Sequence, residues 1–226
     1  MVFLVGDVAP YMAWRSARGL PRGRLDAAGK DRLRAALHWN PYHPDFWLRR
    51  AEDLASGAEW SPAVYAEARE AAESAARLQP ADARYPTGIA RVEALACRTL
   101  FRDEATRARS AARYDEAFER SRHDPFLLIE KGDFLLAAGD PTGARRAAEQ
   151  ALRIEPEAVP PRLLLAEAAL AEGTPASGER AARLLAEAEA GALRWAAWPK
   201  ESPYEAHLLS LDPARVRAIR SRLLQG

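Results

Sequence analysis

The stretch that decides the fold is Pro125–Pro156, which reads PFLLIEKGDFLLAAGDPTGARRAAEQALRIEP. In its first half, Leu128, Gly132 and Leu135 recur at steps of four and three residues, which places them on one face of a helix. The dipeptide Gly139-Asp140 follows, and such a pair is typical of a turn. The stretch therefore predicts a helix, a tight turn and the start of a second helix.

The second half of this stretch predicts a helix with a face of small residues. Pro141 suits the first helical position, where an amide hydrogen would have no partner within the helix. The inner face of this helix consists of Ala144, Ala148, Ala151 and Leu152. Small side chains let two antiparallel helices approach closely, and large side chains fill the space between one hairpin and the next. The sequence thus predicts a stacking helical hairpin, with an ordinary alanine-rich hairpin as the alternative.

Prolines that follow alanine- and leucine-rich helical tails recur along the chain. They are Pro41, Pro80, Pro125 and Pro156, at spacings of 39, 45 and 31 residues. Each interval has room for two helices and two turns. Recurrence at such a period is the sequence signature of a repeat protein.

The helical patterns predict five pairs of helices and a C-terminal cap. The expected pairs are Val8–Arg18 with Arg24–Trp39, Asp45–Gly57 with Ser61–Leu78, Pro86–Arg98 with Asp103–Arg120, the two helices of Pro125–Pro156, and Pro161–Glu172 with Pro175–Ala190. A short helix over Ser202–Leu209 and a last helix from Asp212 to about Leu224 follow. We therefore expect an all-α solenoid of about five antiparallel helix-turn-helix units. It would form a single domain over residues 1–226, with a degenerate unit at 1–41, a repeat core at 42–190 and a cap at 191–226.

The composition agrees with a helical, folded chain. Hydrophobic residues make up 48% of the 226 residues and the net charge is +1, which argues against disorder, and the abundance of alanine and leucine argues against an all-β fold. Cys97 is the single cysteine, so no disulfide can form within the chain. The 33 basic residues, nearly all arginine, are balanced by 32 acidic residues, which argues against a nucleic-acid partner.

The unit Pro125–Pro156 resembles a tetratricopeptide repeat. The family pattern has a large residue, a Leu-Gly pair, a Leu or aromatic residue, a Gly-Asp turn, three small residues and a proline. Here these positions carry Leu128, Lys131-Gly132, Leu135, Gly139-Asp140, Ala144, Ala148, Ala151 and Pro156. The departures are Leu128 in place of the usual Trp and Lys131 in place of the usual Leu. The resemblance implies a right-handed superhelix that binds other proteins without catalysis, with the first helix of each pair lining its concave face.

Three further segments are similar to the soluble C-terminal tail of bacterial O-antigen ligase and polymerase-like membrane proteins. They are Asn40–Trp47, Asp82–Pro86 and Tyr204–Asp212. This resemblance implies an alternative function, the soluble accessory module of a membrane-bound glycan ligase or polymerase-like enzyme. In that interpretation, Met1–Val5 is the end of a preceding membrane helix. No catalytic residue of that family lies in such a tail, so none is implied here.

The first helices of the expected pairs supply a candidate partner-binding groove. Its predicted residues are Asp45, Leu48, Glu52, Arg84, Thr87, Arg91, Phe126, Ile129, Asp133, Leu163 and Glu167. The groove would be mixed in character, with an apolar centre at Phe126, Ile129 and Leu163. Such a groove suits an amphipathic helix or an extended peptide. The alternative for each residue is a place in the core or on a solvated face.

Charge adds two expectations about partners. Arg84 and Arg91 are candidates to bind an acidic side chain through two hydrogen bonds, whereas Asp133 would repel a C-terminal carboxylate. The segment Tyr11–Arg50 has a local charge of +6, from nine basic and three acidic residues. It predicts peripheral contact with an anionic membrane surface, and a solvated surface with internally paired charges is the alternative. The compartment stays open: cytoplasmic by default, and periplasmic or membrane-associated if the chain is part of a membrane protein.

No sequence pattern predicts a catalytic residue, a metal site or a cofactor. His38 and His43 have no third histidine nearby, and Cys97 has no adjacent histidine. The pair Trp195 and Trp198 precedes the cap, where it either closes the last hairpin or forms an exposed aromatic patch. The sequence therefore predicts a non-enzymatic protein whose partner is a protein or peptide.

Overall fold

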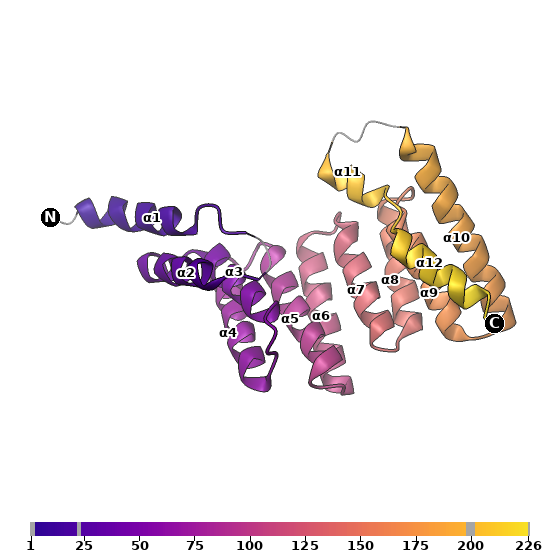
Figure 1. Ribbon diagram of the computed structural model, residues 1–226, viewed down its shortest axis with the longest axis horizontal. Helices are drawn as coiled ribbons and strands as arrows, with labels where there is room; N and C mark the ends of the chain where they lie inside the picture. Colours follow the sequence, from indigo (N-terminus) through magenta and orange to yellow (C-terminus); the bar gives the residue numbers. More distant parts are fainter. Residues whose placement is uncertain (1–2, 22–23, 198–201, 226) are drawn as a thin grey trace. The chain divides into compact units, whose positions relative to one another are not determined.

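The computed structural model describes residues 3–21, 24–197 and 202–225, and within these ranges it is built from helices and contains no strand (Figure 1). The helices are α1 (Phe3–Ala17), α2 (Ala27–Trp39), α3 (Pro44–Ala55), α4 (Pro62–Leu78), α5 (Arg84–Thr99), α6 (Glu104–Arg120), α7 (Pro125–Ala137), α8 (Pro141–Ile154), α9 (Pro160–Glu172), α10 (Pro175–Ala196), α11 (Pro203–Leu208) and α12 (Pro213–Leu223). The predicted all-α class is confirmed.

The helices pack in antiparallel pairs that fall into two compact units. Unit 1 spans Met1–Ser121 and contains the pairs α1–α2, α3–α4 and α5–α6. Unit 2 spans Arg122–Gly226 and contains the pairs α7–α8 and α9–α10, followed by α11 and α12. The five predicted pairs and the C-terminal capping helix are thus present. The division of a single domain at residues 41 and 190 stays a prediction.

Local sequence signals explain where the helices begin. Proline occupies the first helical turn of α3, α4 and of every helix from α7 to α12. Many of these prolines follow a residue whose side chain caps the helix. In the Pro125–Pro156 hairpin, for example, Asp140 Oδ1 accepts a hydrogen bond of 2.8 Å from the backbone amide of Gly143. The preceding Gly139 has φ of 82°, a left-handed conformation that glycine adopts without strain.

Two helix limits differ from the prediction by five residues or more. The first helix begins at Phe3 rather than Val8 and continues through Pro10. The helix that was expected to end at Ala190 continues to Ala196 as α10. Gly191 is buried within α10, where an added Cβ atom would lie 3.8 Å from Val159 Cγ2, and the helix continues past it.

Small residues form the contacts within each pair, as the sequence predicted. Ala144, Ala148 and Ala151 of α8 are completely buried. Opposite them, Gly132 of α7 is so close to the neighbouring helices that an added Cβ atom would collide with Leu164 Cδ2 and lie 3.3 Å from the carbonyl oxygen of Ala144. Gly132 therefore permits a close approach between the first helices of two successive pairs.

Unit 1 buries two acidic residues, Asp53 of α3 and Glu93 of α5, and Glu93 is the more deeply buried of the two at 1% exposed. The Oε1 atom of Glu93 lies 3.6 Å from Arg69 Nε, whereas its Oε2 atom has no hydrogen-bond partner among the described residues. Burial raises the pKa of the Glu93 carboxyl, and the positive charges of Arg69, Arg113 and Arg109 oppose this rise only in part. The ionised form of Glu93 is therefore a net cost to the folded state.

The Glu93→Gln variant is expected to be more stable than the parent chain at about pH 7, by roughly 1 kcal/mol. Because the pKa of Glu93 is raised by folding, the folded chain keeps this proton to a higher pH than the unfolded chain does. Stability of the parent chain therefore falls as the pH rises from the ordinary pKa of glutamate through the raised value. The advantage of the glutamine should accordingly shrink at about pH 4–5.

Urea unfolding of both proteins at the two pH values measures this difference. Glu70→Gln is the matched control, because Glu70 lies on the exposed surface of α4. If Glu93→Gln lost stability at both pH values, the ion pair with Arg69 would instead be net stabilising.

Candidate partner-binding site

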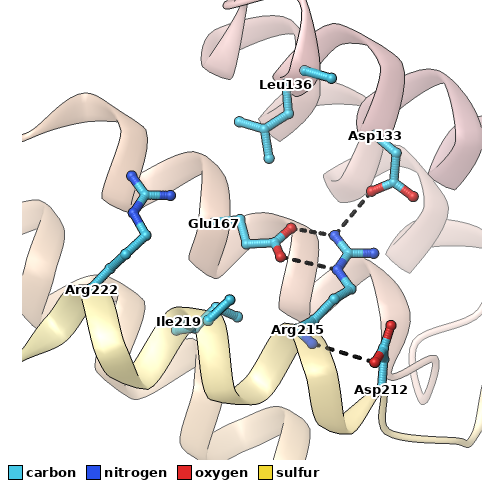
Figure 2. Close-up of a pocket in the computed structure, with 9 residues that line it drawn as sticks. Asp133, Leu136, Glu167, Asp212, Arg215, Ile219 and Arg222 are labelled. Carbon is cyan, nitrogen blue, oxygen red and sulfur yellow. Dashed lines mark hydrogen bonds and ion pairs between the residues drawn. The ribbon is translucent and has the colours of Figure 1, made fainter.

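Unit 2 contains a cavity of about 530 Å³ between α7, α9 and α12, called here the unit 2 cavity (Figure 2). Its lining residues are Asp133, Leu136, Ala137, Glu167, Asp212, Arg215, Ala218, Ile219 and Arg222. Two of them, Asp133 and Glu167, were predicted to line a partner-binding groove. The other wall is α12, which the sequence indicated only as a cap.

Arg215 of α12 binds both predicted acidic residues (Figure 2). Its Nε atom donates a hydrogen bond of 3.1 Å to Glu167 Oε1, and its Nη2 atom donates to Glu167 Oε2. The same Nη2 atom donates to Asp133 Oδ1 at 2.9 Å. Asp212 caps α12 by accepting hydrogen bonds from the backbone amides of Ala214 and Arg215, which fixes the helix turn that carries this side chain.

Burial and neighbouring charges shift the pKa values of Arg215 and Asp133. Burial disfavours the charged guanidinium of Arg215, but the hydrogen bonds and charges of Glu167 and Asp133 outweigh it and raise the pKa of Arg215. Burial raises the pKa of Asp133, and the neighbouring carboxylate of Glu167 adds to this rise while Arg215 opposes it. The guanidinium of Arg215 therefore favours the ionised form of Asp133, against the effect of burial.

The predicted apolar centre of the groove is covered by the chain itself. Leu163 is 1% exposed and packs in a core with Val216 and Ile219 of α12. Ile129 is 6% exposed. Phe126 is half-buried beneath α11, with its ring centroid 5.1 Å from those of Tyr204 and His207. These three residues are thus core or covered residues and are not available as open anchors.

Unit 1 contains a second cavity, of about 300 Å³, between α3 and α5, called here the unit 1 cavity. Its lining residues are Leu48, Ala51, Glu52, Ala55, Ser56, Gly88, Arg91 and Val92. The structure thus brings together three predicted groove residues, Leu48, Glu52 and Arg91. An added Cβ atom at Gly88 would collide with Leu48 Cδ1, so this glycine gives the leucine room to lie between the helices.

The unit 1 cavity has apolar walls and a charged rim. Leu48, Val92 and two alanines form the walls. Arg91 is exposed at the rim, and Glu52 lies opposite with its Oε2 atom 3.5 Å from Arg49 Nη1. This combination can bury an apolar side chain beside an exposed arginine.

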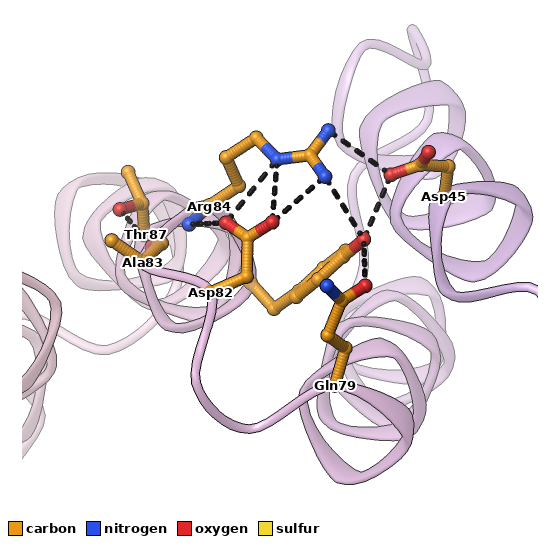
Figure 3. Close-up of polar contacts among 7 residues, drawn as sticks. Asp45, Gln79, Asp82, Ala83, Arg84 and Thr87 are labelled. Atoms are coloured by element: carbon orange, nitrogen blue, oxygen red, sulfur yellow. Dashed lines mark hydrogen bonds and ion pairs between the residues drawn. The ribbon is translucent and has the colours of Figure 1, made fainter. Parts of the chain in front are cut away.

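Arg84, at the start of α5, binds carboxylates of its own chain (Figure 3). Its Nη2 and Nε atoms donate to Asp82 Oδ2 at 2.8 and 3.0 Å, and its Nη1 atom lies 3.2 Å from Asp45 Oδ1. The hydroxyl of the buried Tyr85 donates to the same Asp45 oxygen at 2.9 Å. Arg84 and Asp45 therefore hold α5 against α3.

Hydrogen bonds and burial within this group of residues shift the pKa values of Asp82 and Tyr85. The hydrogen bond from Arg84 lowers the pKa of Asp82. Burial, together with the hydrogen bond to Asp45, raises the pKa of Tyr85 to about 12. Arg84 thus already binds two carboxylates of its own chain. Thr87 lies one turn farther along α5 and is 4% exposed, with its hydroxyl donating 2.6 Å to the carbonyl oxygen of Ala83.

The remaining surface features stay predictions as binding sites. On α1, Tyr11 and Trp14 are about half exposed, and the Arg18 guanidinium lies 5.1 Å from the Trp14 ring centroid. Contact of the basic segment Tyr11–Arg50 with a membrane surface stays a prediction. Trp195 is half-buried on α10, and Trp198 lies outside the described residues.

None of the helices among the described residues combines the length and apolar character that crossing a bilayer requires. No three histidine, cysteine, aspartate or glutamate side chains among these residues are grouped to hold a metal ion. Cys97 is buried, and burial raises the pKa of its thiol above the ordinary value.

Sequence reasoning missed Gly88 and the residues of α12. The small residue at Gly88 was visible in the sequence, but its use as space for Leu48 depends on how α3 packs on α5. Arg215 is 48 residues from Glu167 and 82 residues from Asp133, so no local pattern relates them.

Three solved structures are similar to this chain over most of its length. A crystal structure of MamA has a TM-score of 0.61 at 12% identity and covers 89% of this chain and 99% of its own. TTC0263, a thermophilic TPR protein in Thermus thermophilus, has a TM-score of 0.57 at 18% identity and covers 87% of this chain and 90% of its own. YrrB, a TPR protein with an unusual peptide-binding site, has a TM-score of 0.50 at 12% identity, with coverage of 85% and 91%.

No protein-family model matches the sequence, and no curated protein matches it. At these identities the likeness to solved structures concerns the fold. The similarity to the tails of O-antigen ligases stays a prediction. The paired helices, the small residues between them and the three structural matches agree on one architecture. The chain has the tetratricopeptide-repeat fold.

Proposed function

We propose that this protein is a non-catalytic scaffold that binds a peptide segment of a partner protein in the unit 1 cavity. The observation that carries the proposal is an open cavity between the first helices of two successive pairs, α3 and α5. Stacked helical hairpins typically bind partners on the surface that such helices form. YrrB, with the same fold, is described as having a peptide-binding site.

The size and chemistry of the cavity indicate the kind of peptide. At about 300 Å³ the cavity is at the lower limit for ligand sites, which suits one or two side chains rather than a folded domain. The walls at Leu48 and Val92 would take an apolar anchor side chain. The exposed guanidinium of Arg91 at the rim would pair with an acidic residue of the same peptide. A peptide with an apolar anchor next to a carboxylate fits both features.

A peptide selection tests this proposal. Random peptides displayed on phage are selected on the wild-type chain, and their affinities are measured by fluorescence anisotropy. We expect the selected peptides to lose about tenfold or more in affinity for the Arg91→Glu variant, since a charge-assisted pair is replaced by repulsion. Leu48→Ala should weaken them as well.

Arg98→Glu is the matched control, because Arg98 is an exposed arginine on the same helix outside the cavity. Circular dichroism shows whether each variant keeps its helix content. The proposal fails if no peptide is selected, or if the selected peptides bind Arg91→Glu and Arg98→Glu equally well.

A non-enzymatic role is part of the same proposal. Neither the unit 1 cavity nor the unit 2 cavity is lined by a described histidine or cysteine. The alternative function, an accessory module of a membrane-bound glycan ligase or polymerase-like enzyme, stays a prediction that rests on sequence resemblance.

A further inference from the structure

The C-terminal segment, residues Ser202–Gln225, covers the face of unit 2 that α7 and α9 form. Its first helix, α11, places Tyr204 and His207 against the ring of Phe126. At the end of α11, the carbonyl oxygen of Leu208 accepts a hydrogen bond of 2.8 Å from the backbone amide of Val159, next to α9. The second helix, α12, follows across α9 and α10. The segment therefore occupies the surface on which a tetratricopeptide-like unit would receive a partner.

The contact made by Arg215 has the geometry of specific recognition. Its Nε and Nη2 atoms donate to the two oxygens of Glu167, and Nη2 also donates to Asp133 on another helix. A planar guanidinium can make this forked contact, whereas an ammonium group cannot. The side chains of Arg215 and Glu167 are about four-fifths buried. The two carboxylates thus form a site that fits an arginine.

Apolar side chains of α12 complete the contact on one flank. Val216 and Ile219 are buried against Leu163 and Ala166 of α9. Relative to Arg215 they stand one and four positions later, which is the pattern of an amphipathic helix. The segment therefore binds as an amphipathic helix with an arginine at its edge.

The fit on the other flank is incomplete. The unit 2 cavity remains open between α7 and α12, with Leu136 and Ala137 on one side and Ala218 and Arg222 on the other. Toward α7, the described part of α12 makes its polar contact through the hydrogen bond from Arg215 to Asp133. The C-terminal segment thus leaves part of the surface next to α7 unfilled, as expected of a site that can exchange one helix for another.

We infer that Asp133 and Glu167 form a binding site for an arginine carried by an amphipathic helix, and that the C-terminal segment fills this site as a ligand within the same chain. A partner helix with an arginine and apolar residues one and four positions later would compete for it. The occupied state lowers the apparent affinity of any competitor, because only chains with a displaced segment can bind it. This inference is independent of the peptide site proposed in unit 1.

The test uses the full chain and a fluorescein-labelled peptide with the sequence of residues 202–225, SPYEAHLLSLDPARVRAIRSRLLQ. Arg215→Ala in the chain weakens the internal ligand but keeps its apolar contacts. We expect this variant to bind the peptide about tenfold more tightly than the wild-type chain does. Adding Glu167→Gln should reverse the gain, because the arginine of the peptide then lacks its forked partner.

Arg217→Ala is the matched control, since Arg217 is exposed on the same helix and lies outside the cavity. A second probe is ethylguanidinium, which should raise the melting temperature of Arg215→Ala but not that of Arg215→Ala/Glu167→Gln. Ethylammonium should raise neither. This probe keeps the inference testable if Arg215→Ala folds poorly, because occupation of the site then restores folding.

The outcomes separate a ligand from a permanent cap. If Arg215→Ala and Arg217→Ala bind the peptide equally and ethylguanidinium has no effect, the segment is a fixed cap and the inference is overturned. If Arg215→Ala forms dimers that Glu167→Gln abolishes, the segment of a second copy has taken the site, which supports the inference.

Discussion

Replacing Gly132 with alanine is expected to lower the free energy of unfolding of unit 2 by about 2–3 kcal/mol. The added methyl group would collide with Leu164 Cδ2 and lie 3.3 Å from the Ala144 carbonyl oxygen and 3.5 Å from Ala147 Cβ. Leu164 is completely buried, so it cannot move aside without disturbing the core. The collision outweighs the gain of about 1 kcal/mol that alanine normally brings within a helix.

The matched control is Gly178→Ala in α10. No atom lies within 4 Å of the place where the new Cβ would stand, so the variant should gain about 0.5–1 kcal/mol from helix propensity alone. Urea unfolding followed by circular dichroism measures both variants. Equal effects of the two substitutions would mean that α7 and its neighbours are not closely packed at Gly132.

The Leu163→Ala variant should lose about 3–4 kcal/mol of unfolding free energy. Leu163 is 1% exposed and contributes to the core that α9 and α10 share with Val216 and Ile219 of α12. Removing most of its side chain leaves a cavity that the surrounding helices can fill only in part. Urea unfolding measures the loss, and hydrogen exchange of the α12 amides should rise in parallel because α12 loses an apolar partner.

Leu48→Ala is the informative comparison, because both leucines were predicted to line the same groove. Leu48 is half-buried at the unit 1 cavity, so its truncation should cost about 1 kcal/mol or less. A similar loss of unfolding free energy for the two variants would mean that Leu163 is no more deeply packed than Leu48. A large difference would show that equivalent faces of two first helices, α3 and α9, can carry a cavity residue in one pair and a core residue in the other.

The helices and their pairing could be predicted because the signals for them are local. Asp140 and Pro141 lie together at the start of α8, and Gly139 with its positive φ supplies the turn before them. Helix ends were less predictable, because they depend on packing. Gly191 is of the residue type that commonly ends a helix, but it lies buried within α10.

The candidate site was predictable only in part, because periodicity identifies a face and not what covers it. Leu163 and Glu167 lie one turn apart on the same helix, and both were placed in the groove. One is a core residue and the other binds Arg215, since α12 packs over that face. The pairing of Arg84 with Asp82 is local and visible in the sequence, but its contact with Asp45 joins residues far apart in the chain.

Both cavities draw their positive charge from arginine alone, namely Arg91 in unit 1 and Arg215 with Arg222 in unit 2. The lysines of the chain are Lys30, Lys131 and Lys200; Lys200 lies outside the described residues, and neither Lys30 nor Lys131 lines one of these two cavities. Amine-directed dyes, cross-linkers and coupling resins react with lysine and leave guanidinium groups intact. The protein can therefore be labelled or immobilised through Lys30 and Lys131 while the guanidinium groups that line both cavities stay unmodified.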